Sequence, residues 1–318
     1  MAARSIKRLC RRQRQRVYCA FSALLLTVFL GGASQVTAND ELQLGVMYQP
    51  LNRDADLGAH GWRYLLQQVI ARDIDFGVLQ WTQYGAEGFQ QPRPWLVETA
   101  TLWQHEMPLW LGLHTEPEYF AEMAKGAAAQ QAFFEAYLRK VNASVAQWQV
   151  WTQQHREQFL GWYVPLELSD AYFASAAERA QLHSFLADLK QRLGPTPTAI
   201  SLFLSAAMAP EDLGEWLVEL QDLGYEVWLQ DGVGTQALSE TDRRQYFAKL
   251  NCKVVLINEA FVQTSQQPFQ ARPARNEELK QAMAEQPDCH RRILFSLRYL
   301  PETSGLLYLS DVTKPPQS

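Results

Sequence analysis

Apolar residues recur along this chain in short, unbroken runs, and amphipathic stretches separate most of these runs. Unbroken runs predict strands that are covered on both faces, as in a parallel sheet, because a strand with one solvated face would alternate apolar and polar residues. Eight such runs are expected, at 42–50, 74–82, 108–114, 159–170, 198–205, 226–231, 253–259 and 292–300.

The segments between the runs carry the 3.6-residue periodicity of helices that bury one face. A helix is expected after the first run, with Trp62, Leu65, Leu66, Val69 and Ile70 on one stripe. Others are expected within 95–107, 118–158 with a break near Gly126, 176–193, 209–223, 239–251 and 276–286. Strands that alternate with helices predict a doubly wound sheet or a closed barrel, and the number of strands favours a (β/α)8 TIM barrel. Only residues 301–318 follow the last run, so the eighth helix is expected to be short or missing.

The first 38 residues have the composition of a signal peptide. Seven Lys or Arg side chains precede an apolar run, 20–30, that is short for a membrane span, and Val36-Thr37-Ala38 fits a small-x-small cleavage site. We therefore expect cleavage after Ala38, export to the periplasm or beyond, and one barrel domain over residues 39–318. An uncleaved leader that anchors the protein in the inner membrane is the alternative.

Charge and cysteine content limit the classes of partner. Removing the seven basic leader residues from a chain of formal net charge −5 leaves a net charge near −12, which argues against nucleic acid and anionic lipid as partners. Cys252 and Cys289 remain in the mature chain, and an oxidising compartment would allow them to pair. No CxxC or HExxH spacing is present, so no metal is expected. No GxGxxG or GxxxxGK[ST] motif follows a strand, and no cofactor is expected.

Polar and aromatic side chains gather where the predicted strands end. In a (β/α)8 barrel these strand ends form the mouth where active sites lie. Amide, carboxylate and aromatic groups together suit the hydroxyl groups and ring faces of carbohydrates. The candidates for substrate binding are Tyr48, Gln80, Trp81, Tyr84, His114, Glu116, Tyr163, Asp170, Asp231, Asn258 and Arg298.

Two glutamates stand out among the strand ends. Glu167 ends the fourth predicted strand and Glu259 ends the seventh, so their side chains can face each other across the mouth. Cleavage of a glycosidic bond requires two carboxyl groups, one that donates a proton and one that attacks or activates water. A separation of about 5–5.5 Å between them predicts retention of configuration, and about 6.5–9.5 Å predicts inversion.

The segments Gly161-Trp-Tyr-Val-Pro-Leu-Glu167, Gly45-Val-Met-Tyr-Gln-Pro50 and Ile74-Asp-Phe-Gly-Val-Leu-Gln-Trp81 resemble an uncharacterised family of exported barrel proteins (DUF4434-like). The resemblance spans about residues 42–300. It implies a glycoside hydrolase related in pattern to the retaining barrel glycosidases. Some members of the resembled family are encoded beside exopolysaccharide machinery. By this resemblance Glu167 is the general acid/base and Glu259 the nucleophile. That clan commonly has Asn before the first glutamate, and here Leu166 takes its place.

Two other interpretations remain open at this point. In the first, the protein is a carbohydrate-binding barrel without turnover that is accessory to exopolysaccharide synthesis or export. Leu166 and the missing eighth helix favour this interpretation. The weaker alternative is a barrel of other chemistry centred on Asp231 and His114.

Overall fold

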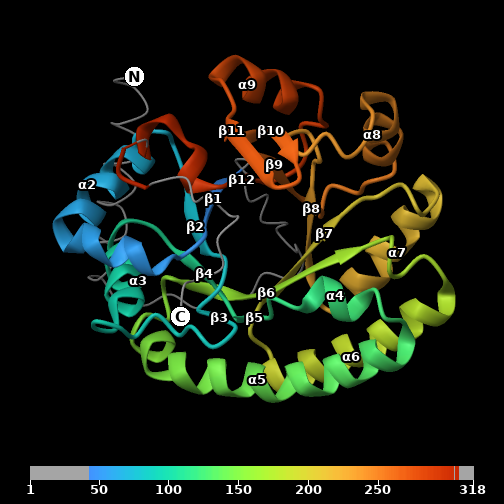
Figure 1. Ribbon diagram of the computed structural model, residues 1–318, viewed down its shortest axis with the longest axis horizontal. Helices are drawn as coiled ribbons and strands as arrows, with labels where there is room; N and C mark the ends of the chain where they lie inside the picture. The colour runs from blue at the N-terminus through green and yellow to red at the C-terminus, as the bar shows by residue number, and fades with distance from the viewer. Residues whose placement is uncertain (1–42, 304, 308–318) are drawn as a thin grey trace, which may run out of the picture. The chain divides into compact units, whose positions relative to one another are not determined.

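The computed structural model of the protein describes residues 43–303 and 305–307. The expected leader and its cleavage site at Ala38 lie outside these residues. Eight parallel strands close into one barrel (Figure 1). Each barrel strand pairs with the barrel strands that precede and follow it in the sequence, and the last pairs with the first. The strands are β1 (Leu44–Tyr48), β2 (Phe76–Leu79), β4 (Leu109–Gly112), β6 (Phe159–Ser169), β7 (Thr198–Phe203), β8 (Glu226–Gln230), β9 (Val255–Glu259) and β12 (Arg292–Phe295). The predicted (β/α)8 barrel is confirmed.

Helices surround the barrel, as Figure 1 shows, and bury its outer face. They are α2 (Gly58–Ile70), α3 (Trp95–Glu106), the short α4 (Tyr119–Met123), α5 (Ala127–Gln154), α6 (Ala176–Leu193), α7 (Pro210–Asp222), α8 (Glu240–Phe247) and α9 (Asn276–Ala284). The expected break near Gly126 separates α4 from α5, because Gly126 has a φ of 89°, which disfavours residues with a Cβ. At α6, Ser175 and Glu178 form a reciprocal capping box.

The eighth helix is absent from the described residues, as the length of the tail predicts. Two 3-10 turns, η2 (Leu297–Tyr299) and η3 (Pro301–Thr303), follow β12 instead. Arg298 of η2 forms a buried ion pair with Asp54 of η1 (Asn52–Leu57), and its guanidinium lies 5.7 Å from the centre of the Tyr48 ring. This end of the chain is therefore fastened to the segment that follows β1.

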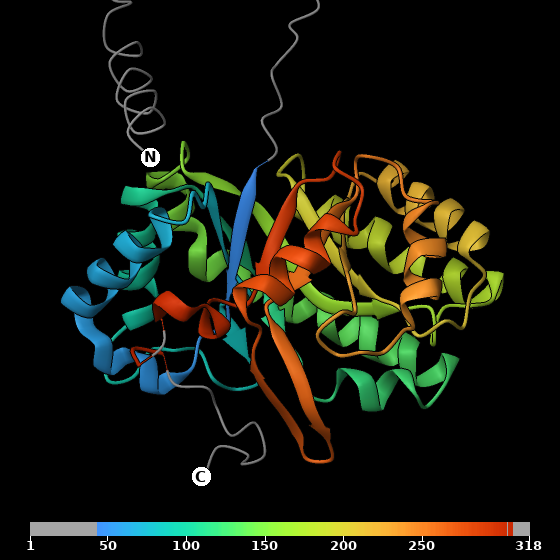
Figure 2. The same ribbon diagram turned by 90° about the horizontal axis from the view of Figure 1, so that it is seen from above.

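Two small sheets extend the barrel strands and were not predicted. Gln83–Tyr84 (β3) pairs with His114–Thr115 (β5), which lengthens the barrel wall beyond β2 and β4. Directly after β9, strands β10 (Phe261–Gln266) and β11 (Phe269–Pro273) form an antiparallel hairpin that projects away from the barrel (Figure 2). The hairpin is mostly polar, so it lacks the apolar run by which the barrel strands could be recognised.

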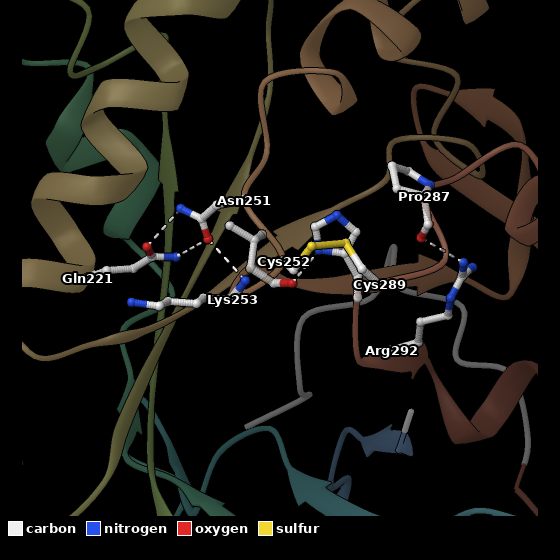
Figure 3. The surroundings of a disulfide bond; sticks show 9 residues. Gln221, Asn251, Cys252, Lys253, Pro287, Cys289 and Arg292 are labelled. Atoms are coloured by element: carbon white, nitrogen blue, oxygen red, sulfur yellow. Dashed lines mark hydrogen bonds between the residues drawn. A yellow bond between two sulfur atoms is a disulfide. The ribbon is translucent and has the colours of Figure 1, made fainter. Parts of the chain in front are cut away.

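Cys252 and Cys289 form a disulfide with Cα atoms 5.3 Å apart (Figure 3), a normal separation. The bond joins the turn before β9 to the turn before β12. Beside it, the side chains of Asn251 and Gln221 exchange two hydrogen bonds of 3.0 and 3.3 Å. The disulfide therefore fastens neighbouring strands at the end of the barrel opposite Glu259.

Removal of the disulfide is expected to destabilise the barrel without changing its fold. The cysteines are 37 residues apart, and closing a loop of that size in the unfolded chain is worth about 3–4 kcal/mol in the chain-entropy model. The Cys252→Ser/Cys289→Ser protein should therefore unfold roughly 10 °C below the wild type in calorimetry. Reductant should lower the melting temperature of the wild type only. An unchanged melting temperature in both comparisons would contradict this assignment.

Candidate functional site

The interior of the barrel is filled by alternate residues of the eight strands. These inward side chains form one cluster, separate from the larger cluster between the strands and the helices. The inward cluster comprises Met47, Phe76, Val78, Trp110, Tyr163, Ala199, Trp228, Val255, Ile257 and Ile293. Because side chains alternate along a strand, the inward positions that follow these residues line the mouth at the C-terminal ends.

Glu167 occupies an inward position on β6. It lies opposite Ser201 of β7, whose hydroxyl bonds that of inward-facing Tyr163 at 2.7 Å. Between Val164 and Glu167, β6 has two more residues than β7, so Pro165 and Leu166 form a bulge. Two extra residues preserve the alternation of faces, and Glu167 points inward as Tyr163 does.

The Glu167 side chain is partly exposed, but the surrounding protein removes much of its hydration. This desolvation raises the pKa of Glu167, and a hydrogen bond from the Gln230 side chain partly opposes the shift. Glu167 therefore retains its proton to a higher pH than an ordinary glutamate, which is the property a general acid requires.

Glu259 occupies the equivalent end of β9, two residues beyond inward-facing Ile257. One carboxylate oxygen, Oε2, accepts a 2.7 Å hydrogen bond from the Thr235 N–H and a 3.2 Å bond from its hydroxyl. A Cβ at Gly234 would lie 2.8 Å from the Cβ of Glu259, so only glycine fits there without a shift. The other oxygen, Oε1, lies 3.4 Å from the Thr235 hydroxyl, a longer contact.

Glu259 is only 4 % exposed. Burial first, and then the neighbouring Asp231 carboxylate, raise the pKa of Glu259 well above its ordinary value. The free protein therefore holds Glu259 protonated at neutral pH. An exposed carboxylate nucleophile would be ionised at the same pH.

Tyr163 fills the barrel beneath Glu167. Its ring stacks on Trp228 with centroids 4.8 Å apart, and it is 1 % exposed. Burial raises the pKa of Tyr163 far above the physiological range, so its hydroxyl remains protonated. Tyr163, Ser201 and Trp228 therefore form a closed floor below the mouth.

Five of the sequence candidates lie outside the inward cluster, between the barrel wall and the segments that surround it. Asp170 accepts four hydrogen bonds of 2.7–3.2 Å from Ser205, Ala207 and Met208, and so holds the loop that follows β7. Asp231 accepts from the side chains of Asn258 and Gln286 at 2.9 and 3.0 Å. These contacts give Asp170, Asp231 and Asn258 structural partners away from the mouth.

The other two candidates outside the inward cluster belong to the tail contact. Tyr48 donates a 2.7 Å hydrogen bond to Asp54, the partner of Arg298, and packs on Trp62. Arg298 donates to the Gln49 carbonyl at 2.8 Å. Arg298 is therefore held by Asp54 and by the end of β1.

The remaining candidates lie along the rim over β2 and β4. Gln80 follows inward-facing Val78, and its buried Oε1 atom has no hydrogen-bond partner among the described residues. Trp81 donates a 3.2 Å hydrogen bond to the Pro50 carbonyl, and its ring packs on the exposed Tyr84 with centroids 5.1 Å apart. Gln80, Trp81 and Tyr84 thus place an amide and an aromatic pair at one side of the mouth.

His114 and Glu116 form a polar pair on the same side. The His114 Nε2 atom lies 3.1 Å from Glu116, which also binds Lys140. Burial lowers the pKa of His114 despite this carboxylate. Desolvation favours protonated Glu116, but hydrogen bonds from Lys140 and His114 outweigh it and lower its pKa. At neutral pH the pair therefore consists of a neutral imidazole and a carboxylate.

Two residues near Glu259 were missed by the sequence analysis, and a third was not chosen as a candidate. The end of the sixth predicted strand brings both Gln230 and Asp231 to the mouth; Asp231 was chosen, but Gln230 contacts Glu167 and Asp231 points the other way. Gly234 and Thr235 position Glu259 from the loop after β8. The spacing of Gln230 two residues after Trp228 was an available signal, but a strand with two buried faces does not reveal which residue faces inward.

A cavity of ≈ 330 Å³ lies elsewhere, between α5, α6 and the beginning of β6. Its lining includes Asn142, Gln149, Phe159, Trp162 and Arg192. It is at the N-terminal end of the strands, away from the two glutamates. Within the described part of the chain, no three His, Cys, Asp or Glu side chains are arranged to hold a metal ion. No helix among residues 43–303 and 305–307 is long and apolar enough to cross a membrane.

Comparison with known proteins gives the barrel a family. Residues 44–303 match the family model described as "Domain of unknown function (DUF4434)". The chain belongs to the DUF4434 family. It is 30 % identical over 276 residues to the uncharacterized protein YbcH of Escherichia coli (strain K12), covering 83 % of this chain and 92 % of that protein.

Solved structures share the barrel of this DUF4434 protein. A "putative alpha-L-fucosidase" from Bacteroides thetaiotaomicron VPI-5482 matches with a TM-score of 0.54 and 16 % identity, covering 86 % of this chain and 91 % of that one. A GH18 chitinase from Pseudoalteromonas aurantia matches with a TM-score of 0.47 and 14 % identity, covering 79 % and 92 %. The fucosidase likeness shows a shared fold, and the chitinase match is too distant to add to it.

Proposed function

We propose that the protein is an exported glycoside hydrolase that acts on a bacterial polysaccharide. The observation that carries the proposal is the placement of Glu167 and Glu259 at inward positions on the C-terminal ends of β6 and β9. These strands are three apart in a closed barrel of eight, so the two carboxyl groups lie on opposing sides of one mouth. The fold of the alpha-L-fucosidase structure is compatible with this chemistry.

In the proposed reaction, Glu167 donates its proton to the glycosidic oxygen as the bond to the anomeric carbon breaks. Oε1 of ionised Glu259 attacks that carbon, because Oε2 is engaged by Thr235. Water then releases the sugar after giving its proton to Glu167. Before its attack Glu259 must lose to solvent the proton that burial holds on it in the free protein. Positive charge on the sugar in the transition state then stabilises the Glu259 carboxylate.

Substrate contacts are assigned to the rim of the mouth. Tyr84 offers an exposed aromatic face that the buried Trp81 ring supports, and Gln80 offers a buried amide oxygen that lacks a partner among the described residues. An unpaired buried acceptor costs about 1–3 kcal/mol, so a ligand hydroxyl that donates to it would gain that amount. Leu166 is 2 % exposed and packs outside the barrel, so it supplies no contact like that of the Asn in the clan.

A carbohydrate-binding barrel without turnover is the second candidate. The burial of Glu259 and its raised pKa favour it, because a protonated carboxyl group cannot attack the anomeric carbon. In this form the protein would serve as an accessory to exopolysaccharide synthesis or export. It predicts sugar binding at the mouth with no release of reducing ends.

Two features support the proposed export of the protein, the N-terminal leader and the disulfide. The basic and apolar leader that ends at Ala38 lies outside the described residues, but the Cys252–Cys289 bond forms readily only in an oxidising compartment such as the periplasm. An inner-membrane anchor would place the same barrel in the same compartment.

The function is tested by incubating the protein with a panel of bacterial exopolysaccharides and measuring new reducing ends. The Glu167→Gln protein is the catalytic control. Glu157→Gln is its matched control, because Glu157 is exposed in the turn that precedes the same strand at the opposite end. Release of reducing ends by the wild type and Glu157→Gln alone supports hydrolysis. Equal release by all three proteins, or binding without release, would reject it.

A further inference from the structure

Phe120 is an exposed aromatic residue close to the proposed site. In the described part of the chain, Tyr64, Tyr84 and Phe120 are the aromatic side chains with more than about a third of their surface exposed. Tyr64 lies on α2, whereas Tyr84 and Phe120 lie on segments that follow barrel strands at the mouth. Exposed aromatic surface beside a mouth is a common feature of a binding site.

The ring of Phe120 meets that of Phe203, with centroids 5.9 Å apart and planes at 70°. Phe203 is the residue after Leu202 on β7 and lies opposite Ser169 of β6. It follows inward-facing Ser201 by two residues, so it also faces inward, one step nearer to the mouth. Since Ser201 lies opposite Glu167, the two phenylalanines lie next to the proposed acid.

Phe120 is exposed although the short helix α4 that carries it is held in place. Tyr119, its neighbour on α4, is 4 % exposed and packs its ring against those of Phe120 and Phe133 at 5.1 and 5.5 Å. The other end of α4 is held by a 3.0 Å hydrogen bond from buried Gln130 of α5 to the Met123 carbonyl. Burial and then the charge of Glu167 raise the pKa of Tyr119, in agreement with a position of α4 near Glu167.

We propose that the exposed ring of Phe120, supported edge-to-face by Phe203, forms a platform that binds the flat, apolar face of the sugar ring on the leaving-group side of Glu167. The inference rests on the proposed function, because the leaving-group side is defined by the proton that Glu167 donates. The glycosidic oxygen next to Glu167 joins the cleaved sugar to the leaving one. The ring on Phe120 is assigned to the leaving sugar, so the site takes an oligosaccharide of at least two units.

The platform is tested by replacing Phe120 with Ala, Leu and Trp, with Tyr64→Ala as the control for loss of an exposed aromatic elsewhere. Binding is measured by tryptophan fluorescence with cellohexaose, chitohexaose, maltohexaose and each polysaccharide of the hydrolysis panel. Phe120→Ala and Phe120→Leu are expected to bind roughly tenfold more weakly than the wild type, as for other central aromatic contacts. Phe120→Trp should retain affinity because it keeps a flat face.

The outcomes separate the platform from the proposed function. Sugar binding that is the same in Phe120→Ala and Tyr64→Ala would overturn the platform and leave hydrolysis untouched. Weaker binding by Phe120→Ala, in a wild-type protein that releases no reducing ends, would support the platform and reject the hydrolase. A wild type that binds none of these glycans would overturn both. Calorimetry of each variant distinguishes lost contacts from lost folding.

Discussion

The Glu167→Gln protein is expected to lose roughly 10²–10⁴-fold in turnover of a natural glycoside while it still binds the sugar. A natural leaving sugar is a poor leaving group and departs only when its oxygen is protonated. Glutamine keeps the size and the hydrogen-bonding capacity of Glu167 but cannot give that proton. Burial raises the pKa of Glu167, so the wild type should retain its acid to a higher pH than an exposed glutamate would allow.

A substrate with a better leaving group is the control for the Glu167→Gln prediction. A 2,4-dinitrophenyl glycoside of the same sugar needs no protonation, so formation of the glycosyl intermediate should be nearly as fast in Glu167→Gln as in the wild type. Burst-phase kinetics measure that first step. If the substitution slows both classes of substrate equally, Glu167 orients the substrate and does not donate the proton.

The second large effect is expected from Glu259→Gln, which should abolish turnover and stabilise the protein at alkaline pH. Because the pKa of Glu259 is raised on folding, folded and unfolded chains hold the same proton below about pH 4.5. As the pH rises, the unfolded chain releases it first, and the stability of the wild type falls until the folded group also ionises near pH 8. Glutamine carries no charge at any pH and avoids this loss.

The stability difference between Glu259→Gln and the wild type should therefore grow from pH 4.5 to pH 8. A rise in pKa from 4.5 to about 8 corresponds to an upper value of about 5 kcal/mol, or roughly 10 °C in melting temperature. Calorimetry of both proteins at several pH values measures it. A difference that does not depend on pH would show that Glu259 is ordinarily ionised in the fold. A residue whose removal stabilises the fold and ends activity is retained for function.

Much of the fold was predictable because barrel strands that are buried on both faces are unbroken apolar runs in the sequence. The runs at 159–170 and 253–259 correspond to β6 and β9, and the helix expected at 176–193 is α6. The hairpin formed by β10 and β11 was not predictable by the same means. It is solvated on much of its surface, so its polar strands resemble a loop.

The candidate site was predicted less completely, and the reason is geometric. Two polar residues stand at the ends of several strands: Gln230 ends β8 and Asp231 follows it, and Asn258 and Glu259 end β9. Their side chains point to opposite sides of the wall, but an unbroken apolar run contains no alternation that distinguishes inside from outside. The sequence therefore offered both Gln230 and Asp231 for the mouth, and Asp231 was chosen as the candidate, whereas the structure turns Gln230 toward Glu167. Phe120 was hidden for a different reason, since it lies in the helical segment expected at 118–158 and not at the end of a predicted strand.

The most direct test of the central claim is a search for a covalent adduct on Glu259. The protein is incubated with 2-deoxy-2-fluoro glycosyl fluorides of several sugar configurations, and its peptides are analysed by mass spectrometry. One adduct is expected, on the peptide that contains Glu259, and it should be absent from Glu259→Gln and present in Glu157→Gln. An adduct on another residue, or none in a protein that hydrolyses the parent glycoside, would contradict it.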